Sequence, residues 1–424
     1  MSAYDFLKKL ASTHRYAGTE NELKAANLIE SEFKNSGYEV EKEETEYIKS
    51  EKYIFVLFGI SLTISGTFTI LSGFFNTLIL GVLILLYFGF LAKVYPKIEL
   101  KFAKSKSVNI IATLNPAMKS RIIVCAHYDS PRVMGKYLQK MLKPLRKIQP
   151  LFSIIRISFI VVLFLFGVYI IVETKTFDLW RGLNYGYWSL IWWFFMVFTI
   201  IQISFTTFFV SQIMTKKYAL GADDNASGIA VLLETARRFK EQKDKINYRI
   251  DFACFAAEER GLFGSRKWVN KHYKEFDRNR TYVLNLDCVG RGKKFLLIKG
   301  LGTIFKKHSD EMLYKILKKT CTELKYPFVE DWGSGSDHAE FLEKKIKCVA
   351  VLRADTEKAN IGHKFLNRLF RIPVPKNEIE VLDWIHTEDD VPEKINTKYL
   401  DETVTLTMKF IENLICETQV HETA

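Results

Sequence analysis

Ionisable side chains recur in this sequence directly after apolar runs. Carboxylates mixed with imidazoles, with no thiolate among them, are typical ligands of zinc or a similar divalent ion. Their number exceeds what one ion can bind, and it suits two ions about 3.5–4 Å apart that share one carboxylate. The residues are His127 and Asp129 in AHYDS, Asp223 and Asp224 in GADDNASG, Glu258 and Glu259 in AAEERGLFGS, Asp287 in LNLDCVG and His386 in DWIHTEDD.

The adjacent glutamates Glu258 and Glu259 are the most informative pair, because they end an apolar run. Neighbouring carboxylates in a partly dry place raise each other's pKa unless a positive charge lies between them. Each motif alone has a simpler explanation. Asp223 and Asp224, for example, stand where a helix N-cap is expected. The combination of all the motifs, in this order, favours a metal site.

Strands and helices alternate in the polar parts of the chain, which predicts an α/β sandwich with a mixed, mainly parallel central sheet. In such sheets the ligand site lies beyond the carboxyl ends of the strands, where the ionisable residues are found. A capping box, Thr19 to Glu22, begins a helix that ends before Gly37. The strand-like runs are 38–48, 109–114, 121–130, 248–259, 281–290, 295–300 and 348–354.

The motifs AHYDS, GADDNASG, AAEERGLFGS, NLD, SGSDHAEF and IHTEDD occur in this order. In this the chain resembles the co-catalytic di-zinc exopeptidase family, which includes leucyl-type aminopeptidases, glutamate carboxypeptidases and glutaminyl cyclases. The resemblance covers the polar segments. It implies the three-layer zinc-exopeptidase fold, two Zn²⁺ ions per chain and a peptide substrate.

The resemblance also implies a ligand set and a backbone feature. One zinc ion would be held by His127 and Asp287, the other by Glu259 and His386, and both would be bridged by Asp224. The family often has a cis peptide bond after the bridging aspartate, which falls here at Asp224–Asn225.

Further residues receive catalytic or binding roles from the family pattern. Glu258 would be the general base that takes a proton from the attacking water and passes it to the leaving amine. Asp129 lies two residues after His127, so it can accept the other ring N–H of that ligand. Asp337 and His338, in GSGSDHAEF, are expected to contact the substrate or to form a hydrogen-bond network in the pocket wall.

Long apolar stretches interrupt the polar segments. Residues 53–92 carry no charge, and two further stretches, 152–172 and 187–214, are nearly as apolar. They predict two transmembrane hairpins, at 52–92 and 151–214, inserted into a catalytic domain formed by 1–51, 93–150 and 215–424. Lysine-rich flanks predict a multi-pass membrane protein with this domain on the cytoplasmic face.

The net charge of +13 lies largely in these flanks, where it would attract anionic lipid, and no separate basic patch indicates nucleic-acid binding. The predicted function is therefore a membrane-anchored zinc aminopeptidase. Two alternatives remain: a glutaminyl-cyclase-like zinc acyltransferase, and a non-catalytic binding module on a membrane anchor. Segment 355–380 fits either a lid over the site or a membrane-contacting loop. The preferred residue and the oligomeric state do not follow from the sequence.

Overall fold

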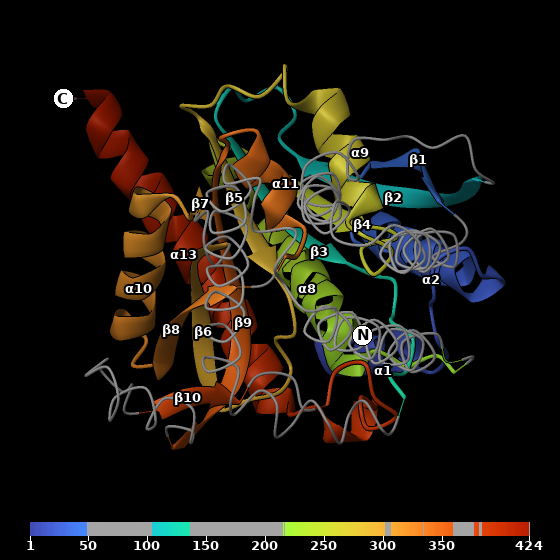
Figure 1. Ribbon diagram of the computed structural model, residues 1–424. Helices are drawn as coiled ribbons and strands as arrows, with labels where there is room; N and C mark the ends of the chain where they lie inside the picture. The colour runs from blue at the N-terminus through green and yellow to red at the C-terminus, as the bar shows by residue number, and fades with distance from the viewer. Residues whose placement is uncertain are drawn as a thin grey trace, which may run out of the picture.

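The computed structural model describes residues 1–48, 104–135, 215, 217–301, 307–333, 335–358, 377–380 and 384–423. Within these residues a ten-stranded sheet is covered by helices on both faces (Figure 1). The α/β, three-layer part of the predicted fold class is therefore confirmed. The boundaries of the predicted domain segments lie in or beside parts of the chain that are not described, so that division stays a prediction.

The strand order is β1-β2-β4-β3-β5-β9-β6-β7, with β8 beside β6 and β10 beside β9. The central strands β4, β3, β5 and β9 run parallel, whereas the pairs β1–β2, β2–β4 and β6–β9 are antiparallel. The strands are β1 (Val40–Ile48), β2 (Lys104–Leu114), β3 (Arg121–His127), β4 (Arg249–Phe255), β5 (Thr281–Leu286), β6 (Lys294–Leu301), β7 (Lys307–His308), β8 (Phe328–Gly333), β9 (Lys347–Lys358) and β10 (Asn377–Glu380).

Two hydrophobic layers explain why the central strands are apolar along their whole length. In β3, Ile122 and Val124 face one layer, while Ile123 and Cys125 face the other. Successive side chains of a strand point to opposite faces, so a strand that is covered on both sides has no polar side. Every residue of β3 and β5 is buried accordingly. The charged and amide side chains of β3 and β5, those of Arg121, His127 and Asn285, accordingly lie at or next to a strand end.

The helices divide between the two faces (Figure 1). The larger layer contains α1 (Ala3–Leu10), α2 (Glu20–Asn35), α8 (Gly228–Glu241), α10 (Glu311–Glu323) and α13 (Thr397–Thr423), and the smaller contains α9 (Phe263–His272) and α11 (His338–Glu343). The predicted cap of α2 is present, since Thr19 Oγ1 accepts the Glu22 N–H. The Glu22 carboxylate instead accepts the Gly18 N–H and the Ser107 hydroxyl.

The transmembrane part of the predicted fold class and localisation is corrected. No helix in the described ranges is both long and apolar enough to cross a membrane. The 16-residue helix α2 is about 24 Å long, against about 30 Å for the hydrocarbon core. Helix α13 is longer, but it carries charges such as Asp401, Glu402 and Lys409. The hairpins predicted at 52–92 and 151–214 lie outside the described residues.

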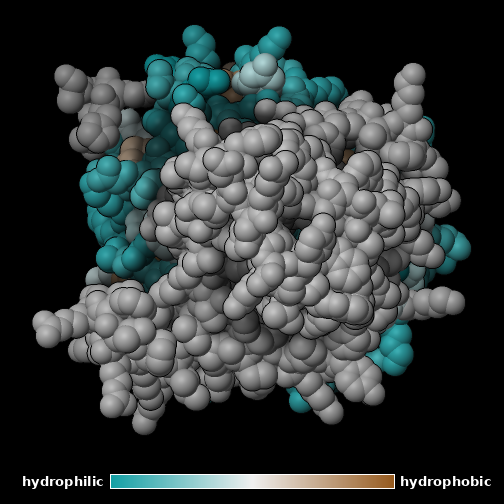
Figure 2. Space-filling model, in the orientation of Figure 1, coloured by the Kyte–Doolittle hydropathy of each residue, from teal (hydrophilic) through white to brown (hydrophobic). Residues whose placement is uncertain are grey.

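Polar side chains dominate the visible described surface in Figure 2. Among the described residues, the exposed large hydrophobic side chains are Met1, Leu23 and Met118. The predicted loop at 355–380 is described only at its two ends, where Asp355–Lys358 of β9 pairs antiparallel with β10. Its part between 359 and 376 lies outside the described residues.

Candidate metal centre

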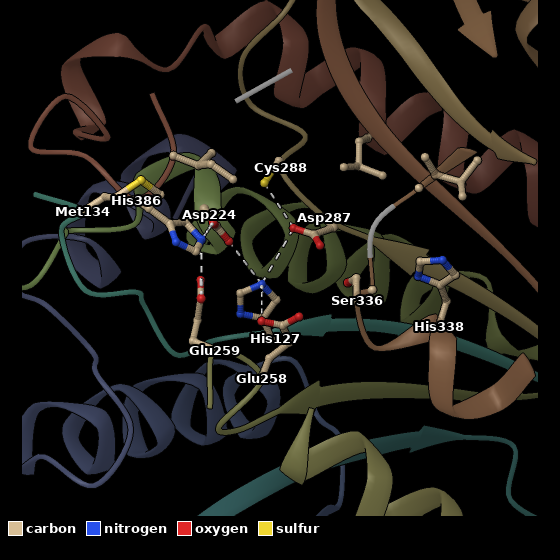
Figure 3. Close-up of a pocket in the computed structure, with 15 residues that line it drawn as sticks. His127, Met134, Asp224, Glu258, Glu259, Asp287, Cys288, Ser336, His338 and His386 are labelled. Atoms are coloured by element: carbon tan, nitrogen blue, oxygen red, sulfur yellow. Dashed lines mark hydrogen bonds and ion pairs between the residues drawn. The ribbon is translucent and has the colours of Figure 1, made fainter. Parts of the chain in front are cut away.

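Three neighbouring parallel strands deliver polar side chains to one edge of the sheet. His127 ends β3, Glu258 and Glu259 follow β4, and Asp287 follows β5. Because β4, β3 and β5 are adjacent and parallel, their carboxyl ends meet. The remaining two groups, Asp224 and His386, come from the turn η3 (Ala222–Ser227) before α8 and from the segment after β10 (Figure 3).

Asp224 lies between the two imidazoles, and each of its oxygens faces one of them. Its Oδ1 is 3.3 Å from His127 Nε2, and its Oδ2 is 3.3 Å from His386 Nε2. His127 Nε2 also lies 3.7 Å from Asp287 Oδ1, whereas His386 Nε2 lies 3.4 Å from Glu259 Oε2. The five side chains thus separate into two sets that share one carboxylate. The Asp224–Asn225 peptide bond is cis, as the resemblance implied.

These separations suit coordination of a metal ion better than direct hydrogen bonds. Good hydrogen bonds to oxygen span about 2.7–3.2 Å. Ligand atoms about 2.1 Å from a tetrahedral ion lie about 3.4 Å from each other, close to the distances from Asp224 to His127 and His386. The ligand atoms of His127, Asp224 and Glu259 all lie within 4.8 Å of one another. The donor set therefore fits zinc or a similar ion.

Burial perturbs the titration of the cluster. It raises the pKa of Glu258 and of Glu259 well above the ordinary value, and nearby carboxylates add to the effect. Burial opposes ionisation of Asp224 too, but the nearby imidazoles of His127 and His386 prevail and lower its pKa. The pKa of His127 is raised against its burial by Glu258 and by the surrounding carboxylates. The site thus attracts positive charge.

Three non-glycine residues at the site have a left-handed backbone. They are Ala257 (φ 52°), Cys288 (φ 51°) and His386 (φ 56°). Ala257 precedes Glu258, and Cys288 follows Asp287. Such conformations cost of the order of 1–3 kcal/mol each and occur mainly at functional sites. The backbone is therefore strained at the points where it directs these side chains into the site.

Asp129 lies behind the cluster and is completely buried. Its carboxylate lies 3.5 Å from His127 Nδ1. The same carboxylate accepts the backbone N–H groups of Glu258, at 3.0 Å, and Glu259, at 3.1 Å. The predicted partner of His127 thus also holds the loop that carries both glutamates.

A buried carboxylate pair lies beneath Asp224: sequence reasoning had named Asp223 as a candidate, but it missed the partner, Asp390. Asp390 accepts the N–H groups of Asp223 and Asp224 at 2.7 and 3.2 Å. Asp223 accepts from Gly290 N–H and from Trp384 Nε1, both at 2.8 Å. Burial, followed by the charge of Asp390, raises the pKa of Asp223 to about 8. Asp223 and Asp390 connect η3, the loop after β5 and the segment of His386. In the sequence, the only indication of this pair was the position of Asp390, four residues after His386.

Arg15 is the other support that the sequence did not reveal. Its side chain is fully buried and donates to four backbone carbonyls, those of Leu10, Tyr128, Leu220 and Gly221. The carbonyl of Tyr128 lies between His127 and Asp129, and the carbonyl of Gly221 precedes η3. Arg15 therefore fixes the two segments that carry His127 and Asp224. Burial lowers its pKa to about 10, so it stays cationic at neutral pH.

A cavity of about 300 Å³ opens beside the cluster. His338 lines it, whereas Asp337 does not, although Asp337 is buried and its pKa is raised by that burial to about 7. Sequence reasoning missed several residues of the wall, among them Met134 and Cys288, whose thiol donates to Asp287 Oδ1. The cluster and the wall together are shown in Figure 3.

Known proteins are similar to this chain in parts of the sequence and in the fold. A probable zinc metalloprotease of Pyrenophora teres f. teres is 45% identical over 75 residues, which are 18% of this chain and 16% of that protein. Aminopeptidase YwaD of Bacillus subtilis is 29% identical over 188 residues, 44% of this chain and 36% of that protein. The chain thus spans well under half of the length of these relatives.

The crystal structure of Porphyromonas gingivalis glutaminyl cyclase superposes with a TM-score of 0.53 at 15% identity, covering 97% of each chain. At this identity the likeness concerns the fold. In sequence, residues 207–411 match peptidase family M28. The matched residues include Asp224, Glu258, Glu259, Asp287 and His386, so most of the candidate metal cluster lies in the part of the chain that is similar to this family.

Proposed function

We propose that this chain is a zinc-dependent aminopeptidase whose site holds two zinc ions. The observation that carries the proposal is the position of Asp224, with one oxygen 3.3 Å from His127 and the other 3.3 Å from His386. A carboxylate placed in this way can bridge two ions. The family match and the zinc peptidases among the similar proteins support the same reaction class.

In this proposal each ion has its own ligands. His127 and Asp287 bind one ion, Glu259 and His386 bind the other, and Asp224 bridges them. Bound zinc would supply Lewis acidity, which polarises the scissile carbonyl and lowers the pKa of a water molecule. The remaining chemistry belongs to side chains of the chain itself.

Glu258 is the general base in this proposal. Its Oε2 lies 3.9 Å from His127 Nε2, so it borders the cluster without belonging to either set of close contacts. Its pKa, raised by burial, suits a group that first accepts a proton from water and then donates it to the leaving amine. Asp129 orients His127 and fixes the Glu258 backbone.

The cavity favours a substrate with a free amino terminus. Its walls include the carboxylates of Asp224, Glu258, Glu259 and Asp287, and no Lys or Arg is among the described residues that line it. A free α-amine could be held there by the metal site and the carboxylates around it, whereas an acetylated one could not. The proposed substrate is thus a peptide from which the N-terminal residue is removed.

The test compares free and N-acetylated forms of the same short peptides with zinc-loaded protein, while zinc content is measured in parallel. We expect release of the first residue from free peptides and none from acetylated ones. Equal cleavage of both forms would contradict the aminopeptidase assignment. A product cyclised at an N-terminal glutamine, with loss of ammonia and no peptide-bond cleavage, would assign the site to acyl transfer instead.

A further inference from the structure

His338 is a buried polar side chain that the proposed reaction does not use. It is 1% exposed, and neither ring nitrogen has a hydrogen-bond partner among the described residues. It nevertheless lines the cavity that contains the metal cluster. Buried polar groups are nearly always satisfied, because an unmade hydrogen bond is costly. A partner supplied by a bound molecule explains why this imidazole is kept at the wall.

The imidazole of His338 is neutral at physiological pH, since burial lowers its pKa to about 4. A neutral imidazole offers one N–H donor and one acceptor nitrogen. It can therefore satisfy an uncharged group that donates or accepts, such as a carboxamide. Charged groups are disfavoured there, because burial removes their hydration.

Apolar residues line the same cavity as His338. Ile298 of β6 and Leu352 of β9 belong to neighbouring strands of the sheet, and both line the wall with His338 of α11. Gly335 leaves room there, since a side chain at this position would meet no atom within 4 Å. In Figure 3, Ser336 lies between His338 and the cluster around His127. This part of the cavity thus combines the polar imidazole of His338 with the apolar side chains of Ile298 and Leu352.

We propose that this part of the cavity receives the side chain of the N-terminal residue of the substrate, and that His338 selects residues with an apolar stem and an uncharged hydrogen-bonding tip. Asparagine and glutamine have this structure. Their carboxamide N–H would donate to the acceptor nitrogen of the ring, or their oxygen would accept from the ring N–H. The inference rests on the aminopeptidase function proposed above and specifies its substrate class.

Shape-matched substrates separate hydrogen bonding from size. Asparagine matches leucine in shape, and glutamine matches methionine, so two pairs of peptides that differ only in the first residue probe two side-chain lengths. We expect kcat/KM of the wild type to favour the carboxamide by about tenfold or more in at least one pair, because a site built for a hydrogen bond rejects an analogue that lacks it.

Two variants of His338 test the assignment. His338→Phe removes both polar atoms, so the kcat/KM ratio of that pair should fall by about 10–100-fold while cleavage of the leucine or methionine peptide persists. His338→Gln keeps a donor and an acceptor and should retain much of the preference. His272→Phe is the control, since His272 lies on α9 outside the cavity, and it should leave both ratios unchanged.

The outcomes distinguish the inference from the function on which it rests. Suppose that the wild type cleaves the leucine and methionine peptides with the same kcat/KM as the asparagine and glutamine peptides, and that His338→Phe changes neither ratio. The proposed role of His338 is then refuted, while the proposed aminopeptidase function stands. If zinc-loaded wild type cleaves none of the four peptides, the proposed function fails and the inference with it.

Discussion

Two buried polar regions lie one behind the other at the carboxyl edge of the sheet, and they differ in how well their atoms are satisfied. In the metal cluster, the groups around Asp224 lie 3.3–3.7 Å apart, too far for good hydrogen bonds. In the support behind it, Asp223 accepts bonds of 2.8 Å, and Arg15 donates one of 2.7 Å to the carbonyl of Tyr128.

This difference in hydrogen bonding indicates that the two regions have different roles. The support network of Arg15, Asp223 and Asp390 is complete within the protein, so its residues contribute to stability. The cluster of Asp224, Glu259 and their neighbours concentrates carboxylates, and under the proposed function cations from outside complete it, so its residues would serve chemistry at some expense of stability. Each prediction below tests this division.

Metal removal should have the largest effect. Because the cluster lacks compensating positive charge of its own, a chelator should reduce peptidase activity to background and lower the melting temperature, and added zinc should restore both. Zinc at a hundredfold excess over its Kd would add about 2.7 kcal/mol to the unfolding free energy. Activity assays and thermal scans with and without zinc provide the measurement. A melting temperature that does not respond to zinc would mean that the cluster is satisfied without metal.

Glu258→Gln comes next. The variant keeps the shape of the side chain but cannot accept a proton, so kcat should fall by about 10²–10⁴-fold. Its unfolding free energy should stay the same or rise, since the variant removes a buried carboxylate that lies close to other carboxylates. Rate, zinc content and denaturant unfolding are compared with those of Glu259→Gln.

For Glu259→Gln we expect weaker zinc binding and partial recovery of activity in excess zinc. If Glu258→Gln loses zinc and Glu259→Gln keeps it, the two roles are reversed.

Arg15→Leu should show the opposite behaviour. It leaves the carbonyls of Leu10, Tyr128, Leu220 and Gly221 without their donor, so the unfolding free energy should decrease by about 4 kcal/mol. Arg237→Leu is the matched control, because Arg237 is exposed on α8 and its ion pairs should be worth less than about 1 kcal/mol. Denaturant melts of both variants give the comparison. Equal stability changes would remove Arg15 from the support.

Glu22 offers the smallest and most specific effect. Burial raises its pKa to about 7, from an ordinary value of 4.5, and the charge of Asp129 adds to this. The folded state therefore holds a proton that the unfolded state releases between pH 4.5 and 7. The unfolding free energy should decrease as pH rises through this window, by about 3 kcal/mol in total.

The control for this pH dependence is Glu22→Gln, which cannot titrate. Its stability curve, measured by denaturant unfolding from pH 4 to 8, should lack this contribution. Parallel curves for the two proteins would show that Glu22 is already ionised when folded.

The sequence predicted what strand patterns and motif order determine. The apolar run of β3 placed His127 at the sheet edge, and the motif after β4 placed Glu258 and Glu259 beside it. It did not reveal Arg15, because a buried arginine that binds only backbone carbonyls leaves no pattern in a sequence. Nor did it give His338 its setting, since the absence of a hydrogen-bond partner appears only when the whole wall is assembled.

The prediction of transmembrane hairpins from the apolar stretches was wrong for a different reason. Length and lack of charge were sufficient to predict spans, but no described helix meets both criteria together. The apolar run 122–126 in β3 reflects burial between two helical layers instead, so apolar composition records burial without identifying what surrounds the segment.

The chain leaves and re-enters the fold at the same two places. Ile48 of β1 pairs with Lys104 of β2, and Arg132 forms a bridge with Tyr218, so each segment between them begins and ends at neighbouring backbone positions. Closing a loop costs entropy that grows only slowly with its length, so such segments can change in size with little effect on the sheet. The sheet should therefore tolerate connections of other lengths in place of 49–103 and 136–214. A chain in which short turns replace them would retain every residue of the metal cluster.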